Sequence, residues 1–134
     1  DNKMAFSKNG EFKYSFRGVN RVVEEKGNQF IRFAQIAWAG EDEEVDPGKI
    51  KYDLRRYFTD ADGVEKMGKG VTFLSDNGPT ELTHILVEEG FGKTSKILEV
   101  IKNRDDFADA VHEAYGDKIS ESDDGTFDLR DILD

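Results

Sequence analysis

The first 74 residues alternate apolar runs with polar turns. Residues 12–25, 29–38 and 49–58 are rich in apolar and aromatic side chains, and 71–74 (VTFL) is a shorter apolar run. Between them lie KGN at 26–28, the charged segment GEDEEVDPG at 40–48, and TDADGVEKMGKG at 59–70. Consecutive strands with short polar connections predict an antiparallel meander, and Gly18 inside the first run predicts a bulge or bend.

From residue 76 onward the apolar positions follow helical spacing. The segment 76–90 carries Leu82, Ile85 and Leu86 on one face, and Gly90 and Gly92 follow it. Further helices are predicted at 93–102 and after Asp105 or Asp106. The expected fold class is therefore α+β: a twisted four-stranded antiparallel sheet (meander) followed by a helix, with a helical C-terminal extension.

This pattern divides the chain into four parts. We expect an N-terminal arm at 1–11, a sheet-plus-helix domain at 12–90, a helical extension at 91–116 and an acidic tail at 117–134. In the third strand, Tyr52 and Leu54 are the apolar positions, and we expect them to face the helix.

Composition narrows the class of protein. The 134 residues are 37 % hydrophobic and 11 % aromatic, enough for a core, and they include no cysteine. Absence of cysteine excludes a disulfide scaffold and thiol catalysis and fits a reducing cytosol. No apolar run is long enough to span a membrane, and no signal-peptide pattern opens the chain. We expect a cytoplasmic protein of prokaryotic or phage type, with nucleoid association as one option and no membrane partner.

The net charge of −10 is unevenly distributed. Residues 1–74 contain 13 basic and 13 acidic side chains, whereas residues 75–134 contain 6 basic and 16 acidic ones. Overall acidity argues against a nucleic-acid partner, because phosphates attract cations. The acidity belongs to the second half, however, so the first half has to be judged separately.

No sequence motif indicates an enzyme, a metal or a cofactor. GFGKTS at 90–95 ends like a phosphate-binding loop, but position 87 is Val where the loop needs Gly. SESDDGTFDLRD at 120–131 has Ser at the first and third ligand positions of a calcium loop. His84 and His112 lie on predicted helices without a cysteine or acid pair to complete a metal site.

Cations and aromatics are interleaved along the first half. Single strands bind proteins through a cationic groove and through aromatic rings that stack on bases. The candidate nucleic-acid-binding residues are Arg17, Arg21, Arg32, Trp38, Lys51, Arg55, Arg56, Tyr57, Phe58, Lys66, Lys69 and Phe73. The alternative is that the aromatics form an ordinary core and that Arg55 and Arg56 pair with the acidic segment 40–48.

Two stretches carry a resemblance to a known family. YDLRRYF (52–58) and KMGKGVTFL (66–74), with IAW (36–38) before an acidic loop, resemble the single-stranded-DNA-binding domain of the coactivator positive cofactor four, especially its bacterial members. The resemblance covers residues 12–90 and implies a homodimer joined through the helix at 79–89, with Leu82, Ile85 and Leu86 at the interface. Phe58 stands where the eukaryotic coactivator has tryptophan, and residues 91–134 have no counterpart in the minimal domain.

The sequence thus predicts a non-enzymatic protein that binds single-stranded DNA, or RNA, largely without sequence preference. It would serve transcription regulation or DNA replication and repair. The alternative is an acidic protein-interaction module that docks on a basic partner or mimics nucleic acid. Residues 105–134 carry a net charge of −9 with Phe127, Leu129, Ile132 and Leu133 among the acids. This tail is a solvated end, a competitor for the DNA surface, or a site for a protein partner.

Overall fold

The structure, a computed structural model, describes residues 13–119, with side chains as far as Gly116. The predicted arm at 1–11 and residues 120–134 of the predicted tail lie outside the described residues. Residues 117–119 belong to a helix, so helical structure extends past the predicted start of the tail. The chain divides into two compact units, residues 1–85 and 86–134, and each is described by itself.

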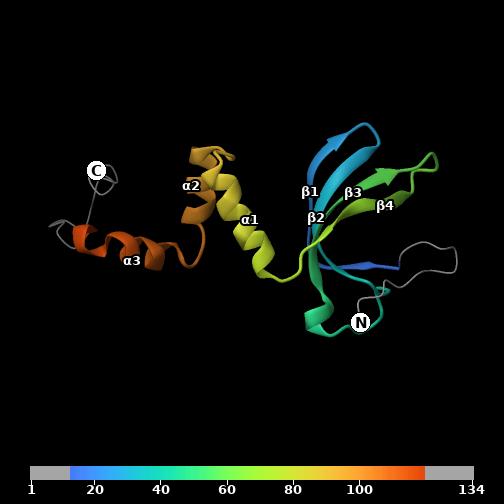
Figure 1. Cartoon of the computed structure of the whole chain (residues 1–134), viewed down its shortest axis with the longest axis horizontal. Helices are drawn as coiled ribbons and strands as arrows, with labels where there is room; N and C mark the ends of the chain where they lie inside the picture. Colours follow the sequence, from blue (N-terminus) through green and yellow to red (C-terminus); the bar gives the residue numbers. More distant parts are fainter. Residues whose placement is uncertain (1–12, 120–134) are drawn as a thin grey trace. The chain divides into compact units, whose positions relative to one another are not determined.

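The first unit contains one antiparallel sheet with the strands in sequence order (Figure 1). Its strands are β1 (Ser15–Lys26), β2 (Gln29–Ala37), β3 (Lys51–Thr59) and β4 (Glu65–Thr72), and a short 3-10 helix, η1 (Pro47–Lys49), precedes β3. The predicted four-stranded meander is therefore confirmed.

The last strand begins earlier than the sequence predicted. Residues 65–70 pair with β3, although their glycines resemble a turn. Backbone pairing outweighs the low strand preference of glycine here, because both glycines lie where the backbones approach closely. A Cβ added to Gly70 would lie 1.8 Å from Cβ of Arg55, and one added to Gly68 would lie 2.9 Å from the carbonyl oxygen of Arg56.

Three register shifts interrupt the ladders of the sheet, one between β3 and β4 and two between β1 and β2, the second of these between Val22 and Glu24. The β3–β4 register shifts between Arg55 and Tyr57, opposite Gly68 and Lys69. In β1 the register shifts between Phe16 and Asn20, so the prediction of a bulge at Gly18 is confirmed. Gly18 has φ +149°, and a Cβ there would collide with the side chain of Gln35. The Oε1 atom of Gln35 accepts a hydrogen bond of 2.9 Å from the Val19 amide inside this bulge.

Alternation along the strands gives the sheet two different faces. We call one the buried face, since most of its side chains are buried: Phe30, Arg32, Ala34, Ile36, Asp53, Arg55 and Tyr57. We call the other the exposed face. Apart from the buried pair of Ser15 and Ala37 at one end, its side chains are exposed or half-buried, among them Arg21, Phe33, Tyr52, Leu54, Arg56, Phe58, Lys66 and Val71.

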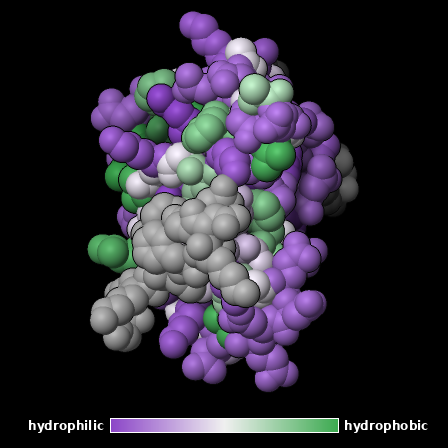
Figure 2. Space-filling view, turned by 90° about the vertical axis from the view of Figure 1, so that its right-hand side faces the viewer, coloured by the Kyte–Doolittle hydropathy of each residue, from purple (hydrophilic) through white to green (hydrophobic). Residues whose placement is uncertain are grey.

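Three helices follow the sheet in the chain: α1 (Asn77–Glu88), α2 (Thr94–Lys102) and α3 (Phe107–Ile119). No residue of α1 or α2 is buried in the described part of the chain. On the face that Figure 2 shows, which is the right-hand side of Figure 1, apolar side chains lie scattered among charged ones. None of the described helices is long and apolar enough to cross a membrane.

The expectation that Tyr52 and Leu54 face the helix stays a prediction. Both are half-buried, and α1 has no buried side chain. The deeply buried positions of β3 are Asp53, Arg55 and Tyr57 on the opposite face. Polar side chains can be buried on this face because they form hydrogen bonds and ion pairs with one another.

Candidate nucleic-acid interface

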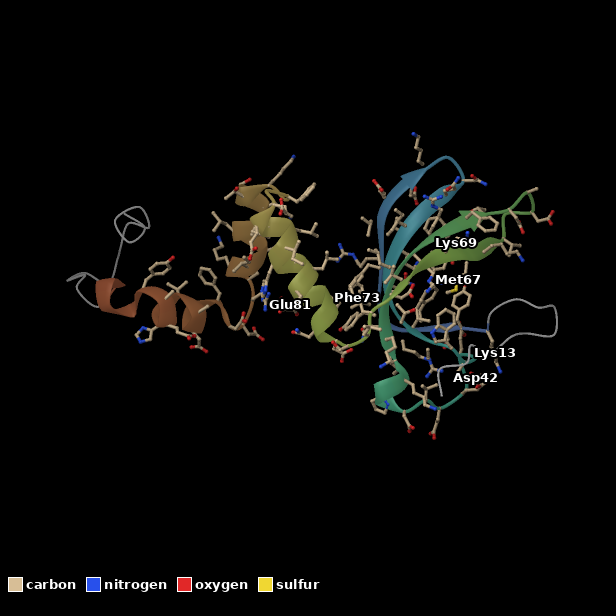
Figure 3. The ribbon with its side chains drawn as sticks, in the orientation of Figure 1. Lys13, Asp42, Met67, Lys69, Phe73 and Glu81 are labelled. Carbon is tan, nitrogen blue, oxygen red and sulfur yellow. The ribbon has the colours of Figure 1, made fainter. Side chains whose placement is uncertain are left out.

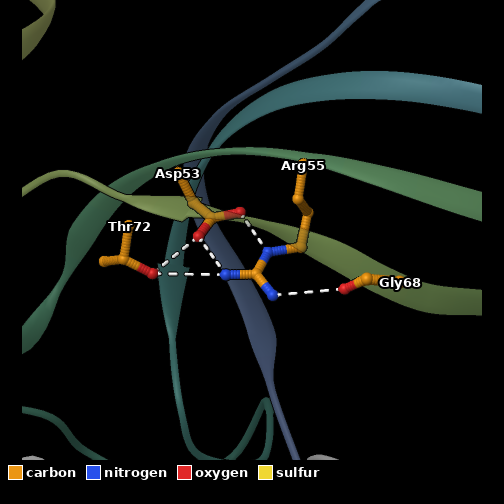
Figure 4. Close-up of polar contacts among 4 residues, drawn as sticks. All are labelled: Asp53, Arg55, Gly68 and Thr72. Carbon is orange, nitrogen blue, oxygen red and sulfur yellow. Dashed lines mark hydrogen bonds and ion pairs between the residues drawn. The ribbon is translucent and has the colours of Figure 1, made fainter.

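Arg55 is held inside a hydrogen-bonded network on the buried face (Figure 4). Its Nε and Nη2 atoms donate to the two carboxylate oxygens of Asp53 at 2.5 and 2.7 Å, while Nη1 donates to the Gly68 carbonyl at 3.3 Å. The Thr72 hydroxyl donates to Asp53 at 2.7 Å. Asp53 is 1 % exposed and Arg55 is 7 % exposed. They therefore form a buried ion pair whose charged groups are hydrogen-bonded to each other and to their neighbours.

A second guanidinium on the buried face is enclosed by rings. Arg32 donates to both carboxylate oxygens of Glu65 at 2.9 and 3.0 Å. Its guanidinium carbon lies 4.6, 5.1 and 4.4 Å from the ring centroids of Phe16, Phe30 and Tyr57. Burial lowers the pKa of Arg32, but hydrogen bonding to Glu65 and its charge outweigh burial, and the net pKa is raised. The guanidinium of Arg32 is thus occupied by contacts with the Glu65 carboxylate and with the three aromatic rings.

Tyr57 is fully buried among these groups. Its ring stacks on Phe30 with centroids 5.5 Å apart and an interplanar angle of 12°. Its hydroxyl has no hydrogen-bond partner among the described residues. Burial raises the pKa of Tyr57 to about 12, against the lowering influence of the neighbouring Arg32. A ring in this position has no face free for a base.

Other candidates are also engaged in the fold. Arg17 donates to Ser15 and, at 2.8 and 2.6 Å, to the carbonyls of Gly40 and Glu43. The half-buried Trp38 ring lies 5.3 Å from the guanidinium carbon of Arg55. Lys51 is half-buried and shares the strand side of Asp53 and Arg55.

The acidic segment 40–46 is held by Arg17 of β1 and by Lys13, which lies just before β1. Besides Arg17, Lys13 forms an ion pair with Glu43, which lowers the pKa of that carboxyl. The alternative that Arg55 and Arg56 pair with this segment is wrong for Arg55, since Asp53 is its partner. Pairing with Arg17 and Lys13 ties the segment to β1 and to the chain just before it.

The exposed face contains the remaining strand candidates. Register places Arg21 opposite Phe33, Phe33 opposite Leu54 and Leu54 opposite Val71, so these four form a row across all strands. A second row runs through Ile31 and Arg56. A third joins Gln29, Phe58 and Lys66. Arg56 is exposed, Lys66 half-buried, and Phe58 39 % exposed. Cations therefore alternate with rings on this face.

Sequence reasoning missed two aromatics of the exposed face as site residues. Phe33 and Tyr52 stack with ring centroids 5.6 Å apart and an interplanar angle of 5°, and Phe73 meets Phe33 edge to face at 6.4 Å. The sequence predicts a core position for Tyr52, because a strand is expected to bury its more apolar side. Only the register with β2 reveals that Tyr52 and Phe33 form a joint aromatic surface with Phe73.

The last candidates lie at the edge of the sheet and on α1. Lys69 is exposed within the β4 irregularity, and Figure 3 shows Lys69 on β4 and Phe73 just beyond it. On α1, Leu82 is half-buried, while Ile85 and Leu86 are exposed. Helical spacing gives these three a common face.

The described residues contain no group of three or more His, Cys, Asp or Glu side chains that could hold a metal ion. Comparison of the chain with protein-family models, with curated proteins and with solved structures gave no match in any of the three. The interpretation of the exposed face therefore depends on its own residues and geometry.

Proposed function

We propose that the protein binds single-stranded DNA on the exposed face of its sheet, largely independently of sequence, and that it catalyses no reaction. One observation carries the proposal: exposed Arg21, Arg56 and Phe58 share a face with the stacked pair of Phe33 and Tyr52. Other cations and rings complete the surface, namely Lys66 and Phe73.

The physical argument combines two forces. Bases stack on aromatic rings with about 1–3 kcal/mol per base whatever their identity, and cations beside the rings attract the backbone phosphates. On the exposed face both groups occur within neighbouring rows of one sheet. Arg32, Arg55 and Tyr57 are left out of this surface, because a ligand would have to break their buried pairs and ring packing.

A homodimer joined through α1 is part of the proposal. Exposed Ile85 and Leu86, beside Leu82, give this helix an apolar stripe that a second copy would cover.

Light scattering should give the mass of a dimer for the wild type. Leu86→Asp should give a monomer, because a carboxylate buried without a partner is costly. The control Thr83→Asp adds the same charge at an exposed polar position of α1 and should remain dimeric. A monomeric wild type would contradict the dimer without touching the DNA proposal.

The binding proposal is tested by fluorescence anisotropy with a labelled, unstructured oligonucleotide, its duplex and the matching RNA at several salt concentrations. The single strand should bind more tightly than the duplex at matched salt. Affinity should fall with salt, with a log–log slope of about 0.7 per phosphate contact. Equal affinity for single strand and duplex, or no binding at low salt, would contradict the proposal and favour the protein-interaction module.

A further inference from the structure

Helix α2 differs in charge from the chain around it. Residues 93–104 contain four basic side chains and one acidic one, a net charge of +3. Residues 76–92 contain no Lys or Arg, and residues 105–134 carry a net charge of −9. A short basic helix inside an acidic half is therefore a local feature that needs its own explanation.

The apolar side chains of α2 form one continuous stripe. At 100° per residue, Val100, Ile97, Ile101 and Leu98 occupy an arc of about 160°. Leu98, Val100 and Ile101 are 50 %, 52 % and 39 % exposed. Lys96 and Lys102 border the stripe on its two sides by the same geometry, and Glu99 lies opposite. A nine-residue helix with an uncovered apolar face is too short to be stable by itself in water.

The segment that best complements this face is at the end of the same chain. Residues 120–134 contain six acidic side chains and one basic one, a net charge of −5. Leu129, Ile132 and Leu133 follow at spacings of three and four, with Phe127 before them. This segment thus combines apolar anchors with the charge opposite to that of the lysines beside the α2 stripe.

Chain length permits the contact. A helix of 13 residues such as α3 measures about 20 Å, and residues 103–106 add at most about 18 Å, so Ile119 is within about 40 Å of Lys102. Fifteen residues extend to about 50 Å. The end of the segment can therefore reach Lys102 even when α3 points directly away, whereas Phe127, eight residues past Ile119 and so within about 28 Å of it, reaches α2 where α3 turns back.

We propose that residues 120–134 bind the apolar, basic-bordered face of α2 and cover it. This is an internal docking surface, independent of the DNA proposal, because it involves no residue of the sheet. In this proposal the acidic tail binds the helical unit and does not compete with DNA for the sheet.

Hydrogen exchange of the full-length protein, followed by mass spectrometry, tests this contact. In the variant with Phe127, Leu129, Ile132 and Leu133 all changed to Ser, amides of 94–102 should exchange at least about fivefold faster than in the wild type. Amides of β2 and β3 serve as the internal control and should not change. Unchanged exchange in α2 would overturn the proposal.

Charge reversal provides a second arm. The variant K93E/K96E/K102E should also exchange faster in α2. Adding D123K/D124K/D128K to it should restore slow exchange, because the two charges are then exchanged between the partners. Failure of the combined variant to restore protection would overturn the role of charge. If protection of α2 in the wild type falls on dilution but is indifferent to the tail substitutions, a second copy covers α2 and the proposal is wrong.

Discussion

Arg55 and Arg56 are neighbours in β3, but they lie on opposite faces of the sheet, and one is buried while the other is exposed. The guanidinium of Arg55 is surrounded by Asp53, Thr72 and the Gly68 carbonyl, so its charge is neutralised inside the protein. Arg56 projects from the other side and is exposed. Cations and rings on the buried face stabilise the fold, whereas those on the exposed face remain accessible to a ligand.

The largest effect is expected from Asp53→Ala, which leaves Arg55 buried without its carboxylate. The free energy of unfolding should fall by about 3–5 kcal/mol, as for other broken buried pairs. Urea denaturation measures this change. The matched variant on the exposed face is Arg56→Ala, which should stay within about 0.5 kcal/mol of wild type. Equal losses for the two variants would mean that the faces do not differ as described.

Alkaline pH should weaken the buried face through Tyr57. Folding raises the pKa of Tyr57 from 10.0 to about 12, so its neutral form is favoured in the folded state. The stability linked to this shift is present below pH 10 and is lost between about pH 10 and 12. A shift of this size corresponds to at most about 3 kcal/mol.

Denaturation of wild type and Tyr57→Phe at pH 7 and pH 12 isolates this group, since the other titrating residues are common to both proteins. The variant should lose less stability at high pH. At pH 7 it should be at least as stable as the wild type, because the hydroxyl lacks a hydrogen-bond partner among the described residues. Identical pH profiles would rule out titration of Tyr57 as the cause.

Gly70→Ala should strain the contact between β4 and Arg55. The added Cβ would lie 2.4 Å from Cα of Arg55 and 2.6 Å from the Leu54 carbonyl oxygen, so backbone has to move. We expect a loss of about 1–3 kcal/mol in unfolding free energy by urea denaturation. Gly48→Ala meets no atom within 4 Å and should be close to neutral. A neutral Gly70→Ala would show that this close approach is not required.

Phe58→Ala should weaken oligonucleotide binding with little loss of stability. Removing one stacking ring costs about 1–3 kcal/mol, or a factor of about 5 to 150 in Kd. Anisotropy titration gives the affinity. Leu74, which is 96 % exposed beyond the end of β4, provides the control through Leu74→Ala, for which we expect unchanged affinity. If both variants bind like wild type, Phe58 is not a stacking site.

The meander and the helices were predictable because apolar spacing and turn residues mark them locally. The start of β4 was not, since Gly68 and Gly70 look like turn residues until their contacts with β3 are known. The sequence places Arg55 and Tyr57 among the ligand-binding candidates, because alternation separates two faces without telling which one is buried. A side containing Asp53 and Arg55 appears polar in sequence, and only their mutual ion pair makes its burial favourable.

The salt dependence of binding tests the central claim most directly. Arg21→Ala/Arg56→Ala removes two exposed cations from the exposed face, whereas Lys51→Ala removes one from the side of Asp53 and Arg55. If both arginines contact phosphates, the log–log slope of oligonucleotide affinity against salt should fall by about 1.4 in the double variant. The slope should stay the same in Lys51→Ala. An unchanged slope in the double variant would contradict binding of single-stranded DNA through the exposed face.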